Sequence, residues 1–210
     1  MTLYYQDDHV TLYHGDCLTE HREWLEADVL VSDVPYGVSY SSGWDNKFRK
    51  VTIANDETVA ARDEALAAWG DRPALVFGSW KAPRPAATRA ILIWDKGTVG
   101  MGAMDIPWFP CTEEIYVLRK GFVGSRTSAV MRHVGRNQHH PTEKPLPLMQ
   151  QLVHKCPPGT IADPFAGSGA TLLAARNLGR KAVGVELEER YCEVIAKRLD
   201  QGVLDIGALA

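Results

Sequence analysis

A glycine-rich turn, with an acid at the end of the next β-prone run, is the feature of this sequence best suited to hold a ligand. A short run ends at Asp163, and the turn that follows consists of Phe165, Ala166, Gly167, Ser168 and Gly169. Small residues let the backbone pass close to a ligand and present amide groups at a helix N-terminus. Glu186 stands 19 residues after Gly167, where a carboxylate can accept hydrogen bonds from a ribose diol. The turn lacks a complete G-x-G-x-x-G pattern and a G-K-[ST] sequence, which disfavours a nicotinamide-dependent dehydrogenase and a P-loop enzyme.

Short β-prone runs alternate with helix-favouring stretches along the chain. Strands are predicted over Val10–His14, Asp28–Ser32, Ala74–Phe77, Ile91–Trp94, Glu114–Leu118, Thr160–Asp163 and Lys181–Glu186. Helices are predicted over Leu18–Ala27, Glu57–Trp69, Leu146–Lys155, Ala170–Leu178 and Glu188–Leu199, the last ended by Gly202, and loops over 97–113 and 120–141. This alternation predicts an α/β fold with a mostly parallel sheet that helices cover on both faces. Ligands of such sheets bind beyond the carboxyl ends of strands, which selects the residues that follow them: Asp16, Asp33, Gly78, Phe165 and Glu186.

The composition is that of one globular domain, with 210 residues of which 45% are hydrophobic and 23% charged. No apolar run is long enough for a membrane span, no secretory signal pattern is present, and the four cysteines lack C-x-x-C spacing. We therefore expect a cytoplasmic protein without a zinc knuckle or a disulfide framework. The formal net charge is −3, yet residues 119–144 carry six Lys or Arg against one acid. Such a segment is either a solvated loop or a surface that meets a phosphate backbone.

Four segments together resemble one enzyme family. D-P-F-A-G-S-G-A-T at 163–171 resembles the cofactor turn of S-adenosyl-L-methionine-dependent methyltransferases, and D-V-P-Y at 33–36 resembles the D-P-P-Y tetrapeptide of amino-methylating DNA methyltransferases. H-P-T-E-K-P at 140–145 is similar to the H-P-T-x-K-P element of the β group, and Gly15-Asp16 resembles its G-D element. The segments follow one another in the permuted order of that group. The resemblance implies a Rossmann-like methyltransferase fold in circularly permuted order, with seven strands of which one is antiparallel.

The D-V-P-Y tetrapeptide carries the groups that methylation of an amino group needs. An exocyclic amino group is a poor nucleophile because its lone pair is delocalised into the ring, and two acceptors on its N–H bonds return electron density to the nitrogen. Asp33 can supply one acceptor, and the resemblance implies that the main-chain carbonyl of Val34 supplies the other. Val34 replaces the family's proline, while Pro35 is retained and favours an extended conformation at Val34. Tyr36 would stack on a base flipped out of the duplex.

The resemblance also implies contacts with the cofactor. Thr142 and Lys144 would lie near the carboxylate of its methionine part, which a hydroxyl and an ammonium suit. Asp16 would accept from the adenine amino group, and the Cys17 amide would contact a ring nitrogen. Phe165 would border the methionine or adenosine part. The cofactor-binding set is completed by Asp163, Ala166, Gly167, Ser168, Gly169 and Glu186.

The basic segment 119–140 occupies the place of the family's target-recognition region, inserted before the cofactor turn. Its candidates for phosphate or guanine contacts are Arg119, Lys120, Arg126, Arg132 and Arg136. The polar and aromatic stretch Ser39–Lys50 is typical of a loop over a flipped base, or of a plain surface loop. We expect a single methyltransferase domain over residues 1–210 that acts on double-stranded DNA and has no metal site.

The sequence thus predicts a DNA methyltransferase that uses S-adenosyl-L-methionine, and the acid at position 33 favours adenine N6 over cytosine N4. Direct in-line transfer is expected, because the one Pro-Cys pair, Pro110-Cys111, lies in a loop without the cytosine-C5 pattern. An RNA or protein-amide methyltransferase is a second hypothesis, which the acid and the permuted order disfavour. A catalytically weak nucleic-acid-binding module with the cofactor fold is a third. A bacterial or phage-infected cell is the expected setting; a partner nuclease and a homodimer stay open.

Overall fold

The computed structural model describes residues 2–20, 22–36, 58–97, 107–134 and 143–207, with only the helical backbone over 202–207. Nine strands in these ranges form one mixed sheet. They are β1 (Thr2–Gln6), β2 (Val10–His14), β3 (Val29–Ser32), β4 (Ala74–Gly78), β5 (Thr88–Asp95), β6 (Thr112–Leu118), β7 (Val130–Arg132), β8 (Ile161–Asp163) and β9 (Ala182–Glu186). Their order across the sheet is β1-β2-β9-β8-β3-β4-β6-β5-β7.

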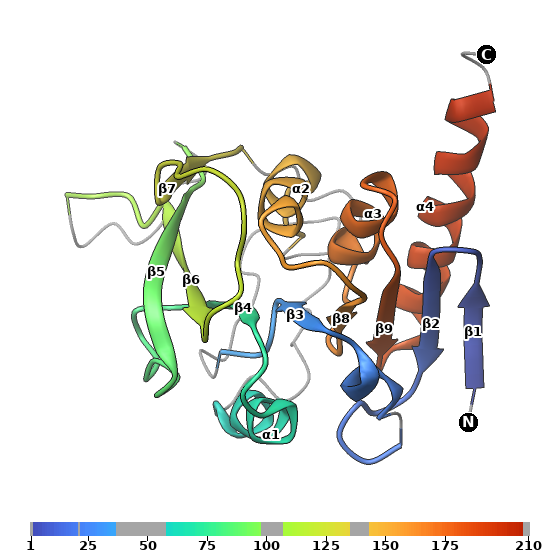
Figure 1. Cartoon of the computed structure of the whole chain (residues 1–210), viewed down its shortest axis with the longest axis horizontal. Coiled ribbons are helices and arrows are strands. Elements are labelled where there is room, and N and C mark those ends of the chain that lie inside the picture. The colour runs from blue at the N-terminus through green and yellow to red at the C-terminus, as the bar shows by residue number, and fades with distance from the viewer. Residues whose placement is uncertain (1, 21, 37–57, 98–106, 135–142, 208–210) are drawn as a thin grey trace.

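Helices cover both faces of the sheet (Figure 1), and the α/β fold class is confirmed. On one face lie α2 (Leu146–His154), α3 (Ala170–Asn177) and α4 (Glu189–Gly207), and on the other lie α1 (Ala60–Trp69) and the 3-10 turn η1 (Glu23–Glu26). Successive side chains of a strand point to opposite faces. In β3, Val29 and Val31 pack in the core on the α2–α4 side, whereas Leu30 packs in the core formed with η1 and α1.

The described sheet has nine strands, and not the seven that the resemblance implies. β2, β9, β8, β3 and β4 run parallel to one another, β6 is antiparallel to both β4 and β5, and β1 is antiparallel to β2. The strands that no sequence pattern predicted are the outermost ones, β1 beside β2 and β7 beside β5. β7 also corrects the predicted loop over 120–141. Both are short runs whose strand conformation depends on pairing with a neighbour, a context that sequence patterns do not contain.

The helix predicted over Leu18–Ala27 is reduced to the 3-10 turn η1. The Asp16 carboxylate accepts a hydrogen bond from the Leu18 amide at 2.8 Å, which forms a local turn in place of a first helical turn. The Cys17 carbonyl accepts from the Trp24 indole at 2.9 Å, and this tertiary bond fixes the path of the segment.

Helix α4 is longer than predicted, since it continues past Leu199 and Gly202 to Gly207. A glycine inside a helix costs about 1 kcal/mol relative to alanine, an amount that the surrounding helical residues can offset. Among the described residues no helix has the length and apolar character needed to cross a membrane.

The direction of each strand decides which residues share an end of the sheet. β2, β9, β8, β3, β4 and β5 all end on one side, which we call the Asp33 end because Asp33 directly follows β3. β6 runs the other way, so its first residue, Thr112, pairs with Asp95 at the end of β5. The start of β6 therefore lies at the Asp33 end, and Arg119, which follows its last residue, lies at the opposite end.

Candidate active site

Asp33 and the glycine-rich turn follow neighbouring parallel strands, β3 and β8. Ser32, the residue before Asp33, donates from its hydroxyl to Asp163 Oδ1 at 2.7 Å. The same oxygen of Asp163 accepts from the Phe165 amide at 3.3 Å, which fixes the beginning of the turn. Ser32 and Asp163 are both buried. The predicted catalytic acid and the predicted cofactor turn are thereby brought together at the Asp33 end.

Lys144 binds the Asp33 carboxylate directly. Its Nζ donates to Asp33 Oδ2 at 2.5 Å and to the Tyr36 hydroxyl oxygen at 3.0 Å. The Tyr36 hydroxyl in turn donates to Asp33 Oδ1. The Lys144 side chain is only 4% exposed, so this contact is built into the protein interior. The structure brings the ammonium to the predicted catalytic acid, and its contact with a methionine carboxylate stays a prediction.

Glu113 is a candidate site residue that the sequence analysis missed. It is the second residue of β6, and its Oε2 lies 3.3 Å from the Tyr36 hydroxyl and 3.4 Å from Lys144 Nζ. Lys96, which directly follows β5, lies 2.5 Å from the other oxygen, Oε1. The strand pattern selects residues that follow strand ends, whereas Glu113 stands at the start of an antiparallel strand. Its only signal in the sequence is the Glu113-Glu114 pair before an apolar run.

Burial and mutual attraction set the charges in this cluster. Burial opposes the ammonium of Lys144, but Asp33 and Glu113 outweigh it and raise the Lys144 pKa above its ordinary value. Burial raises the pKa of Asp33, although Lys144 works against that change. Burial also acts to raise the pKa of Glu113, but Lys144 and Lys96 lower it overall. Burial together with the two acids raises the pKa of Tyr36 well above its usual value. Lys144 is therefore cationic and Tyr36 neutral at physiological pH.

Glu143 connects the segment before α2 to the glycine-rich turn. Its Oε1 lies 3.0 Å from Nη1 of Arg198 in α4, and the same Nη1 donates to the Ser168 carbonyl at 2.6 Å. Glu143 is buried, and the Arg198 side chain is 12% exposed. Two consecutive residues thus face the two parts of the site, since Glu143 is tied to the turn and Lys144 to Asp33. Sequence reasoning identified neither Glu143 nor Arg198, because their roles depend on a contact between distant elements.

The glycine-rich turn is fixed against Glu186. The Gly167 amide donates to Glu186 Oε2 at 2.7 Å, and the Glu188 amide donates to Oε1 at 2.8 Å. Burial raises the pKa of Glu186 to about 7, although both amide bonds oppose this change. Gly169 has a φ of +77°, and a Cβ at this position would lie 2.8 Å from Ile195 Cγ1, so no larger residue fits. The turn is therefore packed tightly against α4 at Gly169, with a buried carboxylate beside it, and its close approach to a ligand stays a prediction.

The other cofactor candidates among the described residues lie at the same end of the sheet. Burial raises the pKa of Asp163 to about 6, and its Ser32 bond gives this residue a part in joining β3 to β8. Asp16 and Cys17 follow β2, the parallel neighbour of β9, whose last residue is Glu186. The Gly15 amide donates to the Glu186 carbonyl at 3.0 Å, so these two strand ends are linked by the backbone. Phe165 is half-buried, and Ala166 is buried in the turn. The contacts of all these residues with a cofactor stay predictions.

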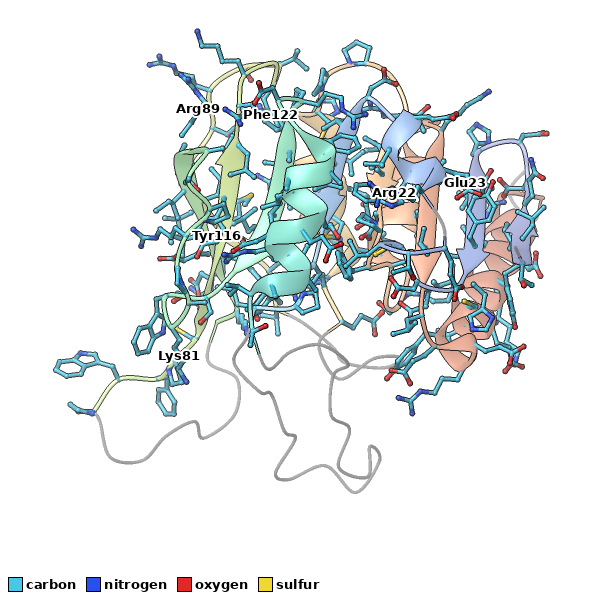
Figure 2. The ribbon with its side chains drawn as sticks, turned by 90° about the horizontal axis from the view of Figure 1, so that it is seen from below. Arg22, Glu23, Lys81, Arg89, Tyr116 and Phe122 are labelled. Atoms are coloured by element: carbon cyan, nitrogen blue, oxygen red, sulfur yellow. The ribbon has the colours of Figure 1, made fainter. Side chains whose placement is uncertain are left out.

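The predicted DNA-contacting residues are divided between the two ends of the sheet. Arg119 and Lys120 follow β6 and lie at the opposite end from Asp33, where Arg119 forms an ion pair of 2.5 Å with Asp71. Figure 2 labels Phe122, which follows them, at this opposite end. The contacts of Arg119 and Lys120 with DNA stay predictions, and the structure places both residues at the opposite end of the sheet from Asp33. The reason is the antiparallel direction of β6, which carries the residues after it away from the site.

The other basic candidates differ from this pair. Arg132 ends β7, which is parallel to β5, and its Nε lies 3.7 Å from an oxygen of Asp95 at the Asp33 end. Arg126 is exposed in the connection between β6 and β7. Three predictions fall outside the described residues and stay predictions: Thr142, Arg136 and the loop Ser39–Lys50.

The family model for N6/N4 DNA methylases matches residues 44–198, well over half of the chain. The matched range contains the glycine-rich turn, Lys144 and Glu113, and it begins after Tyr36. Among curated relatives, the type II methyltransferase M.ScaI of Streptomyces caespitosus is 38% identical over 76 residues, which are 35% of this chain and 25% of that enzyme. The type II methyltransferase M2.DpnII of Streptococcus pneumoniae is 36% identical over 81 residues, 38% of this chain and 29% of that enzyme. The chain thus spans less than a third of the length of these relatives.

Solved structures show the same fold. The M1.HpyAVI–SAM complex superposes with a TM-score of 0.63 at 19% identity, covering 90% of this chain and 99% of that one. The PvuII DNA methyltransferase, described as cytosine-N4-specific, gives a TM-score of 0.69 at 14% identity, covering 92% of this chain and 87% of that one. The two solved structures support the fold, and the family model supports membership of the family. The chain belongs to the N6/N4 DNA methylase family.

Proposed function

We propose that this protein transfers a methyl group from S-adenosyl-L-methionine to the N6 amino group of an adenine flipped out of double-stranded DNA. Membership of the N6/N4 DNA methylase family supports the class of reaction. The carboxylate at position 33 supports adenine over cytosine, because the resemblance associates an acid with adenine and a serine with cytosine in this group. The bacterial relatives M.ScaI and M2.DpnII support a cytoplasmic setting in a bacterial or phage-infected cell.

One observation carries the proposal: Ser32, next to Asp33, is hydrogen-bonded to Asp163 at the start of the glycine-rich turn. The 2.7 Å bond from Ser32 to Asp163 joins the ends of β3 and β8, so the acid and the turn face the same space beyond the sheet. A nucleophile held at Asp33 would then lie beside a methyl donor held at the turn. Juxtaposition of two reactants in this way can supply a large part of a rate enhancement.

The chain supplies acceptors for the amino group. Asp33 and the Val34 carbonyl would each accept one N–H bond, which concentrates electron density on the nitrogen, and Tyr36 would stack on the ring. As the new N–CH₃ bond forms and the S–CH₃ bond breaks, the nitrogen loses one proton to the Asp33 carboxylate or to water. The pKa of Asp33 is raised by burial, which makes its carboxylate a better proton acceptor than an exposed one.

The donor and acceptor groups at the turn fit S-adenosyl-L-methionine, which supplies an electrophilic methyl group when bound. Glu186 offers a buried carboxylate to the ribose diol. Asp16 and Cys17 follow the adjacent strand, where they would bind the adenine, and Thr142 with Lys144 would bind the methionine carboxylate. Phe165, Ala166, Gly167 and Ser168, all in the turn, would contact the cofactor between these groups.

Aromatic and basic side chains support a DNA surface at the Asp33 end. Trp80, just beyond β4, is 71% exposed, and the Lys81 ammonium lies 5.7 Å from its ring. Trp108 and Phe109, shortly before β6, are 75% and 54% exposed. Arg132 adds a cation from β7. Exposed aromatic rings beside cations suit the bases and phosphates of a partly opened duplex.

Mass spectrometry of nucleosides tests the proposal. Plasmid DNA from a host without adenine or cytosine methylation is incubated with the protein and methyl-labelled S-adenosyl-L-methionine, and then digested. We expect labelled N6-methyladenine with the native protein, formed at least about 100-fold more slowly with Asp33→Ala. Labelled N4-methylcytosine instead would correct the base and keep the reaction class. An absence of label in DNA, despite measured cofactor binding, would overturn the proposal.

A further inference from the structure

The oxygens that the target amino group needs at Asp33 are bound by two donors of the protein itself. Lys144 Nζ donates to Oδ2 at 2.5 Å, and the Tyr36 hydroxyl donates to Oδ1. An amino group that enters this site competes with both. Displaced donors in a buried place are costly unless another acceptor receives them, and a buried ammonium is the costlier of the two.

A second acceptor stands beside both donors. Glu113 Oε2 lies 3.4 Å from Lys144 Nζ and 3.3 Å from the Tyr36 hydroxyl, so a small displacement transfers either donor from Asp33 to Glu113. The opposite oxygen, Oε1, is held at 2.5 Å by Lys96, and the backbone of Glu113 is paired with Trp94 within the sheet. Glu113 is therefore held in place by the sheet and by Lys96, and its Oε2 faces Lys144 and Tyr36.

We propose that Glu113 is a positioning residue for methyl transfer, which receives Lys144 and Tyr36 when the target amino group takes their place at Asp33. This inference rests on the proposed function, since it assigns the entering group to the base that is methylated. Glu113 acts through Lys144 and Tyr36, and needs no contact with the reacting atoms. Lys144 has three N–H donors, so one can bind the methionine carboxylate of the cofactor while another changes from Asp33 to Glu113.

The neighbouring acid provides a matched control. Glu114 is the next residue of β6 and faces the other side of the sheet, where its Oε2 accepts from the Tyr116 hydroxyl at 2.7 Å. Its Oε1 accepts from Arg84 at 2.7 Å. Glu113→Gln and Glu114→Gln thus remove the same charge from adjacent positions of one strand. Only the first change removes a negative charge and one acceptor oxygen from beside Lys144 and Tyr36.

Single-turnover methylation of duplex DNA, at saturating S-adenosyl-L-methionine, is the first measurement. We expect Glu113→Gln to lower the rate by about tenfold or more, with the affinities for cofactor and DNA unchanged within about twofold. Glu114→Gln should change none of the three quantities by more than about twofold. An equal loss in both variants, or a loss of cofactor affinity in Glu113→Gln, would show a general structural role and overturn the inference.

A double-mutant cycle with Lys144→Met tests the route of the effect. If Glu113 acts by receiving Lys144, its loss should cost less than about threefold once Lys144 is absent, because the coupled residues share one interaction. Additive losses would refute this route.

Carbon-13 NMR of the aspartate carboxyl groups, without DNA, separates the inference from the proposed function. Glu113→Gln should lower the titration midpoint of Asp33, since one neighbouring negative charge is removed, while Glu114→Gln leaves it unchanged. A lowered midpoint with an unchanged methylation rate would overturn the positioning role and leave the proposed function standing. A native protein that methylates no DNA would remove the proposed function, and the inference with it.

Discussion

The sheet has a parallel part, β2, β9, β8, β3 and β4, and a mixed part, β6, β5 and β7. The two parts bring residues to the Asp33 end in opposite ways. In the parallel part, each strand contributes the residues that follow its last one, as Asp33 follows β3 and Phe165 follows β8 shortly after its end. In the mixed part, β6 contributes Glu113 from its beginning, whereas Arg119 and Lys120, which follow its last residue, lie at the opposite end of the sheet. The reversal of one strand therefore adds an acid to the site and removes Arg119 and Lys120 from it.

The largest expected effect is at Asp33, where the two parts meet. Asp33→Ala removes the carboxylate that accepts from the amino group, so the single-turnover methylation rate should fall by about 100-fold to 1,000-fold. The affinity for S-adenosyl-L-methionine, measured by calorimetry, should change by less than about threefold, because the cofactor residues belong to other strands. A comparable loss of cofactor binding would show that Asp33 and the turn do not have separate roles.

The next effect concerns the parallel part alone. Glu186→Gln should raise the Kd for S-adenosyl-L-methionine by about 10-fold to 100-fold, because hydrogen bonds from the ribose diol lose their charged acceptor. Glu188→Gln is the control, since the Glu188 side chain is 2.6 Å from Arg190 and only its backbone amide binds Glu186. Affinity for DNA should stay the same in both variants. Weakened DNA binding in Glu186→Gln would contradict the division between the two parts.

The pH dependence of cofactor binding sharpens the same division. The pKa of Glu186 is raised to about 7, and the ionised form is the better acceptor, so affinity should rise about fivefold to tenfold between about pH 6 and 8. Glu186→Gln should abolish this dependence.

The stability of the cofactor-free protein should change with pH in the opposite direction. A raised pKa means that folding takes up a proton, so the contribution of Glu186 to stability is full below its ordinary pKa of 4.5 and is lost as the pH rises through about 7. Thermal unfolding of the free protein across this range measures that contribution.

The smallest expected effect distinguishes the two ends of the mixed part. Arg132→Ala should weaken DNA binding about threefold to tenfold and reduce its salt dependence by about one phosphate contact, whereas Arg119→Ala should change binding by less than about twofold. Fluorescence anisotropy with labelled duplex DNA at several salt concentrations measures both quantities. Equal losses would place the DNA over both ends of the sheet and end the distinction between them.

Most of the parallel part could be predicted from the sequence, because local patterns specify it. The apolar runs that end at Ser32, Asp163 and Glu186 are buried strands, and the small residues after Asp163 predict a close turn. Residues that follow parallel strands share one end of a sheet whatever the order of the strands. The relation between Asp33 and the turn was therefore predictable before any pairing was known.

The mixed part could not be predicted in the same way, because strand direction is a property of pairing. The run Glu114–Leu118 indicates a strand but does not show that it is antiparallel to both neighbours. Without that direction, Glu113 has no reason to lie near Asp33, and Arg119 no reason to lie far from it. The pairing of Lys144 with Asp33 is likewise a contact between distant segments. The resemblance assigns Lys144 to the cofactor and does not indicate this pairing.

The alternation of side chains along β6 also limits how the length of the chain can vary. Adding one residue between Glu114 and Ile115 would move Glu114 to the face that Glu113 now occupies, since a shift of one residue exchanges the two faces of a strand. Adding residues before Thr112 changes no pairing within β6. Insertions and deletions that alter target contacts can therefore accumulate in the connection from β5 to β6, a few residues from the site, while the strand itself keeps a constant length.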